Sequence, residues 1–144
     1  MAGFTLIELV MTLVLVGALA VFALPKFTDI AAWQGRAFGD TVVAQCQRML
    51  QLSLNQRRPI QATITGSGVS FAYVSGASLL SLSCPSSASS CIAEGGSRTV
   101  IFNNGNTGSS LTSTGTTMSV TITAGGYTQV YQIDSDSGLM YPMP

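Results

Sequence analysis

The feature that most constrains this chain is an apolar run near its N-terminus. The 21 residues from Phe4 to Leu24 contain one charged side chain, that of Glu8. The only other polar side chains in the run are those of Thr5 and Thr12. As an α-helix the run would be roughly 31 Å long, close to the hydrocarbon thickness of a bilayer. It is too long for the apolar region of a cleaved signal peptide, so it predicts a helix that spans a membrane or is buried in an assembly.

A helical period continues beyond the apolar run. At 100° per residue, apolar side chains recur on one stripe and charged ones lie opposite, which is typical of an amphipathic helix with one buried face. The stripe consists of Phe27, Ala31, Phe38, Val42, Met49 and Leu52. Gly35 and Gly39 interrupt it, and each costs a helix about 1 kcal/mol relative to Ala.

Together the two patterns predict one helix from about Phe4 to Asn55, with Pro25 as a point where it can kink. Residues 4–25 form its apolar part and residues 26–58 its amphipathic part. Such a helix would be on the order of 78 Å long, far longer than a compact domain of this size. We therefore expect its apolar half to protrude.

After Pro59 the period changes from 3.6 to 2, as in β-strands. Short connections between the alternating segments predict an antiparallel sheet, one face of which packs on the amphipathic helix. The fold class expected is α+β, with residues 59–144 as the β domain. The expected strands are Ile60–Thr65, Val69–Val74, Arg98–Phe102, Thr116–Thr123, Tyr127–Ile133 and Leu139–Tyr141.

The segment from Gly3 to Val10, which reads GFTLIELV, resembles the processing signal of type IV pilins and type II secretion pseudopilins. In that family a prepilin peptidase cuts after the glycine and methylates the new N-terminus. The resemblance implies a short leader of residues 1–3, cleavage after Gly3 and an N-methylated Phe4. Glu8 matches the family's acidic position, and Pro25 lies where the family often has a helix-loosening proline.

The end of the chain, from Tyr131 to Tyr141, resembles the last hairpin of minor pilins of the mannose-sensitive haemagglutinin type or of the pseudopilin H type. The resemblance implies a pilin fold with a long N-terminal helix. It also implies four partners: other pilin subunits, the inner membrane, the prepilin peptidase and the assembly platform. The expected location is a single-pass inner-membrane precursor that later joins a surface pilus or a periplasmic filament, with residues 59–144 outside the cytoplasm.

Glu8 carries the main functional hypothesis. A charged carboxylate deep in a bilayer costs on the order of 2.5–3.5 kcal/mol, so its presence needs a reason. One interpretation is an acid near a helix end that snorkels or is protonated. The interpretation we favour is an ion pair with the free α-amino group of Phe4 in a neighbouring subunit, which removes both desolvation costs and sets the register between subunits.

Cys84 and Cys91 bracket a loop of small residues that has no core of its own. A disulfide would pin this loop if the domain lies outside the cytoplasm. The alternatives are two free thiols or a metal pair, although the chain has no His and no C-x-x-C spacing. Cys46 lies near the buried stripe and is interpreted as a small core residue.

Asp134 and Asp136 open a D-x-D-x-G pattern like the start of a calcium loop, but no Glu follows at the twelfth position. They are a weak candidate for calcium, and we favour a polar β-turn with no metal. Apart from this possibility, no cofactor is expected.

Composition narrows the function further. The chain has no His, six Lys and Arg against six Asp and Glu, and four charged residues after position 58. This leaves few groups for acid–base chemistry or phosphate contacts, so neither an enzyme nor a nucleic-acid partner is expected. The sequence favours a structural minor subunit of a type IV pilus, which would support pilus assembly, adhesion or motility. The alternatives are a minor pseudopilin of a type II secretion system and, in third place, a membrane-anchored enzyme using Asp134 and Asp136.

Overall fold

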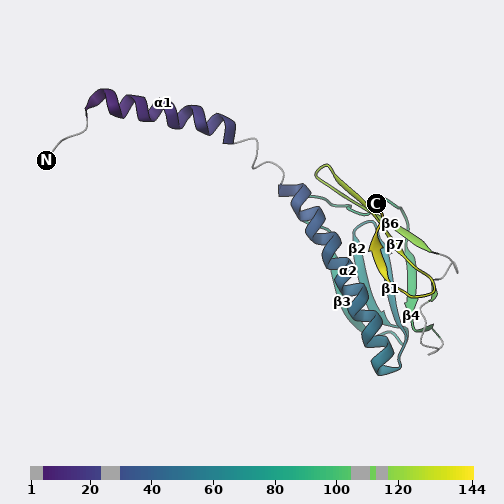
Figure 1. Ribbon diagram of the computed structural model, residues 1–144. Coiled ribbons are helices and arrows are strands. Elements are labelled where there is room, and N and C mark those ends of the chain that lie inside the picture. Colours follow the sequence, from purple (N-terminus) through teal and green to yellow (C-terminus); the bar gives the residue numbers. More distant parts are fainter. Residues whose placement is uncertain (1–4, 24–29, 105–110, 113–116) are drawn as a thin grey trace. The chain divides into compact units, whose positions relative to one another are not determined.

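The computed structural model describes residues 5–23, 30–104, 111–112 and 117–144. The chain forms two compact units, Met1–Ile30 and Ala31–Pro144. The first contains helix α1 (Leu6–Ala23), and helix α2 (Ile30–Gln56) belongs with the strands of the second (Figure 1). The amphipathic helix and the β-strands therefore share one unit.

The prediction of a pilin fold with one long N-terminal helix is wrong. Helix α1 ends at Ala23 and α2 begins at Ile30, so two separate helices replace the expected single one. Within the described ranges, no helix is both long enough and apolar enough to cross a membrane. Proline disfavours the helical conformation in the residue before it, which agrees with a helix end ahead of Pro25. Pro25 and Phe27 themselves lie outside the described residues.

The second unit contains two antiparallel sheets in place of the one expected. A five-stranded sheet has the order β3-β2-β1-β4-β5, and a three-stranded sheet has the order β6-β7-β8. Every pairing is antiparallel, as the short connections predicted. The strands are β1 (Ile60–Thr65), β2 (Gly68–Tyr73), β3 (Ser78–Ser83), β4 (Arg98–Phe102), β5 (Leu111–Thr112), β6 (Met118–Ala124), β7 (Tyr127–Ile133) and β8 (Met140–Pro142).

Six of these strands lie where the sequence predicted strands, within about two residues at the ends. Strands β3 and β5 were not expected. The pairing of β3 with β2 shifts register between Phe71 and Ala72, which leaves Leu79 as an extra residue in β3. Two consecutive leucines, Leu79 and Leu80, break the alternation that marks a strand in the sequence, and the bulge accommodates the extra residue.

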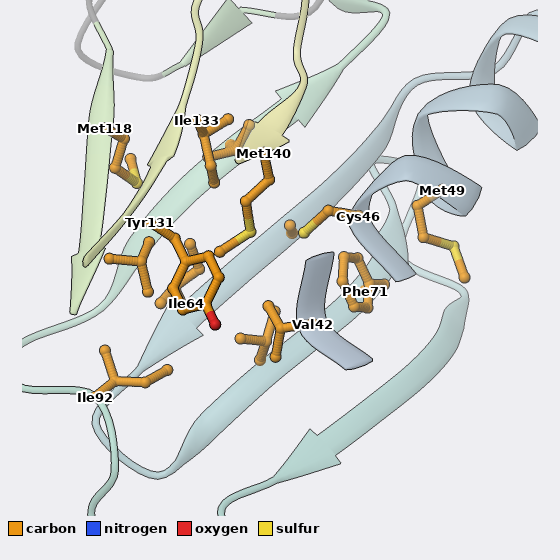
Figure 2. Close-up of a cluster of buried hydrophobic side chains, with 14 of the residues drawn as sticks. Val42, Cys46, Met49, Ile64, Phe71, Ile92, Met118, Tyr131, Ile133 and Met140 are labelled. Atoms are coloured by element: carbon orange, nitrogen blue, oxygen red, sulfur yellow. The ribbon is translucent and has the colours of Figure 1, made fainter. Parts of the chain in front are cut away.

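The core of the second unit is a single cluster of apolar side chains from α2 and both sheets (Figure 2). Helix α2 contributes the stripe predicted from its period, including Phe38, Val42 and Met49. Cys46 is also fully buried in this stripe, as expected, and burial raises the pKa of its thiol to about 12. Opposite them lie apolar side chains of the sheets, including Ile60, Ile64, Phe71, Val100, Phe102, Val120, Ile122, Ile133 and Met140.

The two glycines that weaken the helical pattern of α2 are contact points with the three-stranded sheet. A Cβ atom built on Gly39 would collide with the hydroxyl of Tyr131, and one built on Gly35 would lie 2.8 Å from the Cβ of Ala124. Any side chain at these positions would push the helix away from β6 and β7. The glycines therefore lower helix propensity but allow the close approach of helix and sheet.

The end of α2 is fixed by hydrogen bonds to its last carbonyl groups. Arg57 has a φ of 51°, and the amides of Arg57 and Arg58 donate to the carbonyls of Leu54 and Ser53. This is the pattern of a Schellman C-cap, with an arginine where glycine is usual. The buried side chain of Asn103, just after β4, also donates to the Ser53 carbonyl, at 3.0 Å. The helix end is thereby tied to the five-stranded sheet.

Candidate functional site: an apolar helix and a disulfide-bonded loop

Helix α1 exposes almost all of its apolar side chains. The exposed fraction ranges from 82% for Leu6 to 49% for Val10. The other large exposed residues of the helix are Ile7, Leu9, Met11, Leu13, Val14, Leu15, Val16, Leu19 and Val21. A continuous apolar surface of this kind marks an interaction site in a folded protein, because water leaves apolar surface when a partner covers it.

The polar groups of α1 lie in its first two turns. The amide of Glu8 donates a hydrogen bond to the carbonyl of Thr5 at 3.1 Å. The same amide also donates to the Thr5 hydroxyl oxygen at 3.4 Å. Thr5 and Glu8 therefore have the spacing of a capping box, and a carboxylate in the first turn is favourable to the helix dipole. The Thr12 hydroxyl donates to the Leu9 carbonyl, so this hydroxyl is not left unpaired on the apolar surface. The capping role of Thr5 was missed, although its spacing from Glu8 was readable in the sequence.

Glu8 itself is exposed, and within the described part of the chain it forms no ion pair. Its proposed partner, the α-amino group of Phe4, belongs to a residue outside the described ranges, as do Gly3 and Pro25. Of the residues assigned to processing and assembly, the structure therefore places Glu8 alone.

Cys84 and Cys91 form a disulfide with a Cα–Cα distance of 5.6 Å. The loop that it closes is tied to the turn between β1 and β2, because the Ser90 hydroxyl and the Cys91 amide both donate to the Gly66 carbonyl. The pairing expected from the sequence is therefore present, and its effect is to fix where the chain leaves the loop.

After the disulfide, the chain runs along the edge of β6. The Thr123 amide donates to the Cys91 carbonyl at 2.7 Å, and the Ala93 amide donates to the Thr121 carbonyl at 2.9 Å. A β-bridge pairs Ile92 with Ile122 between them. Residues 91–94, which we call the strap, thus connect the disulfide loop to the three-stranded sheet.

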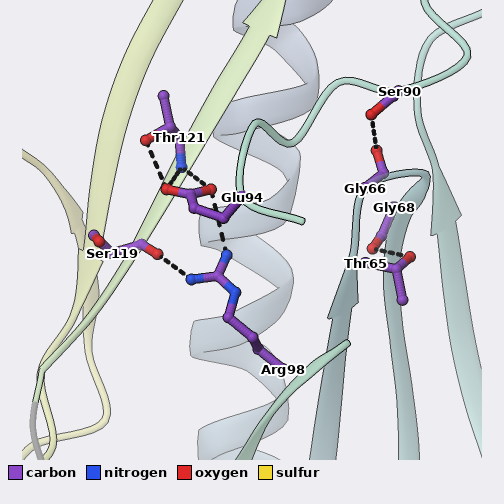
Figure 3. Close-up of polar contacts among 8 residues, drawn as sticks. All are labelled: Thr65, Gly66, Gly68, Ser90, Glu94, Arg98, Ser119 and Thr121. Atoms are coloured by element: carbon purple, nitrogen blue, oxygen red, sulfur yellow. Dashed lines mark hydrogen bonds and ion pairs between the residues drawn. The ribbon is translucent and has the colours of Figure 1, made fainter. Parts of the chain in front are cut away.

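Glu94 ends the strap with a carboxylate that accepts hydrogen bonds from Thr121 (Figure 3). Arg98 at the start of β4 forms an ion pair with Glu94, N to O 3.3 Å, and also donates to the Ser119 carbonyl. The side chain of Arg98 is 25% exposed and that of Glu94 is 28% exposed, so solvent partly screens the pair. This cluster, which links the two sheets, was not recognised in the sequence, where its members appear only as isolated charges.

Asp134 takes part in a turn between β7 and β8. Its carboxylate accepts hydrogen bonds from the amide and hydroxyl of Ser137, and these bonds hold its pKa below the ordinary value. The Gly138 amide closes the turn on the Asp134 carbonyl, at 2.9 Å. Asp136 is exposed. Among the described residues, no three His, Cys, Asp or Glu side chains gather into a group that could hold a metal ion.

A groove of about 370 Å³ lies between α2 and the three-stranded sheet. Its lining includes Arg36, Asp40, Gln47, Tyr127, Gln129 and Tyr131. Burial raises the pKa of Tyr131 well above its usual range, and a hydrogen bond of 3.1 Å to the Tyr127 hydroxyl adds to this shift. The hydroxyl of Tyr131 therefore holds its proton more tightly than that of an exposed tyrosine.

Two further aromatic side chains, those of Trp33 and Tyr73, lie in different surroundings. Trp33 projects from α2 away from the buried stripe and is 73% exposed. The Tyr73 hydroxyl donates to Gln56 at 2.6 Å, and the guanidinium of Arg58 stacks 4.1 Å from the centre of the Tyr73 ring. Tyr73 therefore belongs to the junction of α2 with the five-stranded sheet.

Comparisons with protein-family models, with curated proteins and with solved structures find no match for this chain.

Proposed function

We propose that this protein is a structural subunit of a type IV pilin-like filament, and that it assembles through α1. The observation that carries the proposal is the exposed apolar surface of α1, with a single carboxylate, Glu8, in its first turn. In a filament, helices of neighbouring copies cover this surface and remove its apolar side chains from water. The second unit, with few charges and a disulfide, is the part that faces outward.

In this proposal Glu8 sets the register between copies. Cleavage after Gly3 creates an α-amino group at Phe4, and a carboxylate of a neighbouring copy neutralises it among apolar side chains. An unpaired charge of either sign is costly in such surroundings, so each group selects a position where the other is present. Support for this assignment comes from the sequence motif around Glu8.

The accompanying location is an inner-membrane precursor that passes into a filament, and the accompanying partners are the prepilin peptidase and the assembly platform. A minor pseudopilin of a type II secretion system shares all of these features and is the second candidate. A membrane-anchored enzyme that uses Asp134 and Asp136 is the third.

The test is incorporation of a Glu8→Ala variant into filaments, with Thr12→Ala as the matched control. Both substitutions remove a polar group from α1, but the Thr12 hydroxyl donates to the carbonyl of its own helix. We expect both variants to fold, with unchanged circular dichroism, and only Glu8→Ala to be absent from purified filaments. Normal incorporation of Glu8→Ala would contradict the role of the carboxylate.

A second measurement tests processing. The intact mass of the assembled protein should lack Met1–Gly3 and carry one added methyl group. A mass equal to that of the full chain would contradict the assignment of Gly3 and Phe4.

A further inference from the structure

Strand β3 is a long edge of the five-stranded sheet. It pairs with β2 on one side, and on its other side it pairs with no strand among the described residues. An open edge exposes backbone N–H and C=O groups that can pair with a strand of another chain, so folded proteins usually cover or blunt their edges.

The other sheet edges in the described part of the chain are protected. Strand β5 is two residues long, and β8 is three residues long and ends in Pro142. The edge of β6 is covered by the strap, and the Glu94 carboxylate occupies the Thr121 amide. Strand β3 has six residues, no proline and no charged side chain, so it differs from the rest.

The direction of the backbone groups of β3 follows from its neighbour. The Cys84 amide donates to the Ser67 carbonyl across the β2–β3 pair. In an antiparallel pair the residues alternate between facing the partner strand and facing away. Leu82 and Leu80 therefore face β2, whereas the amide and carbonyl groups of Ser83 and Ser81 point outward.

The strands around this edge carry no charged side chain, although Arg58 contacts Ser75 in the turn between β2 and β3. No Asp, Glu, Lys or Arg occurs from Pro59 to Ala93, a segment that contains β1, β2, β3 and the disulfide loop. Burying such a surface against another protein desolvates no ion, and two identical copies meet there without like-charge repulsion. The edge thus favours a partner that is itself uncharged.

We propose that the β3 edge is an interface between two copies of this chain, in which the two β3 strands pair antiparallel about a two-fold axis at Ser81. The outward amide and carbonyl of Ser81 exchange hydrogen bonds with the same groups of the second copy. Leu80 of one copy lies opposite Leu82 of the other, on the face that packs on the core. The five-stranded sheets of the two copies then form one continuous sheet. Such a contact is self-complementary, as a two-fold interface requires.

About an axis at Ser81, Ser83 lies opposite Leu79 of the other copy. The bulge at Leu79 therefore limits regular pairing to residues 80–82, so the contact is short. An interface of that size is weak between free copies, because stable interfaces bury roughly 1,200–2,000 Å² in total. The contact becomes effective where copies are held close together, because a high local concentration compensates for weak affinity. A two-fold contact does not join successive subunits of one helical filament, so this proposal goes beyond the proposed function and does not depend on it.

The test is oxidative cross-linking of the full chain in detergent, comparing Ser81→Cys with Ser70→Cys. Both serines are exposed and lie directly opposite each other on neighbouring strands. At the two-fold axis, residues 81 of the two copies lie about 5.5 Å apart between Cα atoms, within reach of a disulfide. Residues 70 are separated by three strand spacings, about 14 Å, which is too far.

We expect covalent dimers from Ser81→Cys and none above the wild-type background from Ser70→Cys. Clustering through α1 would cross-link both variants equally, and that result, or no dimer from either, would overturn the proposal. A Ser81→Lys substitution places two like charges at the axis and should weaken dimerisation several-fold in sedimentation, whereas Ser70→Lys should not. Loss of filament incorporation in Glu8→Ala, with the Ser81→Cys dimer retained, would separate this interface from α1 assembly.

Discussion

The carboxylate of Glu94 accepts the hydrogen bond of the Thr121 amide, which a backbone carbonyl accepts elsewhere in a sheet. Both carboxylate oxygens lie 2.9 Å from the Thr121 amide nitrogen, and Oε1 also accepts the Thr121 hydroxyl at 2.7 Å. Through this contact the strap ends on β6, and through the Glu94–Arg98 ion pair β6 is linked to β4. A side chain thus continues the edge pairing that the backbone of residues 91–93 begins.

Glu94→Ala should lower the free energy of unfolding by about 1–2 kcal/mol, because it leaves the Thr121 amide without an acceptor. The partial exposure of the site keeps the loss below that of a fully buried charged group. Chemical denaturation measures the change. Asp136→Ala, which removes an exposed carboxylate, is the control and should change stability by no more than about 0.5 kcal/mol. Equal losses in the two variants would show that Glu94 is an ordinary surface charge.

Acid should weaken the same contact. Partial burial raises the pKa of the Glu94 carboxyl, but the hydrogen bonds from Thr121 and the charge of Arg98 outweigh it and hold the pKa below its ordinary value of 4.5. The folded state therefore binds the proton less readily than the unfolded state. Its contribution to stability is present above pH 4.5 and is lost as the pH falls through the lowered pKa. We expect the stability difference between wild type and Glu94→Gln to shrink on acidification from pH 7 to pH 3; a constant difference would contradict this assignment.

Gly39→Ala should destabilise the second unit although alanine is the better helix former. The new methyl group collides with the Tyr131 hydroxyl, and such overpacking costs about 1–3 kcal/mol, against a gain of about 1 kcal/mol in helix propensity. Thermal unfolding should therefore show a lower midpoint. The double variant with Tyr131→Phe removes the colliding oxygen and should recover part of the loss, whereas a purely local helix effect would give no such rescue.

Reduction of the Cys84–Cys91 disulfide should lower the free energy of unfolding by about 2–3 kcal/mol, as expected for the release of a short loop. The double variant Cys84→Ser with Cys91→Ser should match the reduced wild type. Denaturant unfolding with and without a dithiol reductant measures the loss. Unchanged stability on reduction would mean that the hydrogen bonds of Ser90 and Cys91 to Gly66 hold the loop without the disulfide.

Local periodicity was sufficient for much of this fold. The stripe of α2, six strands and their antiparallel pairing follow from which residues alternate or recur, because burial on one face imposes the period. The pairing of Cys84 with Cys91 was also readable, since the two residues bracket a loop without a core. The apolar surface of α1 was also evident from the sequence, because residues 4–24 contain a single charged side chain.

Tertiary structure decided what depends on contacts distant in sequence. It separated α1 from α2, where an unbroken helix was expected, and it divided the strands between two sheets. It also brought Glu94 to Thr121 and Gly39 to Tyr131, pairs that no local pattern joins, because each contact arises only when one sheet packs beside the other or beside the helix. The sequence determined which faces must be buried, and the packing of those faces determined which polar side chains meet.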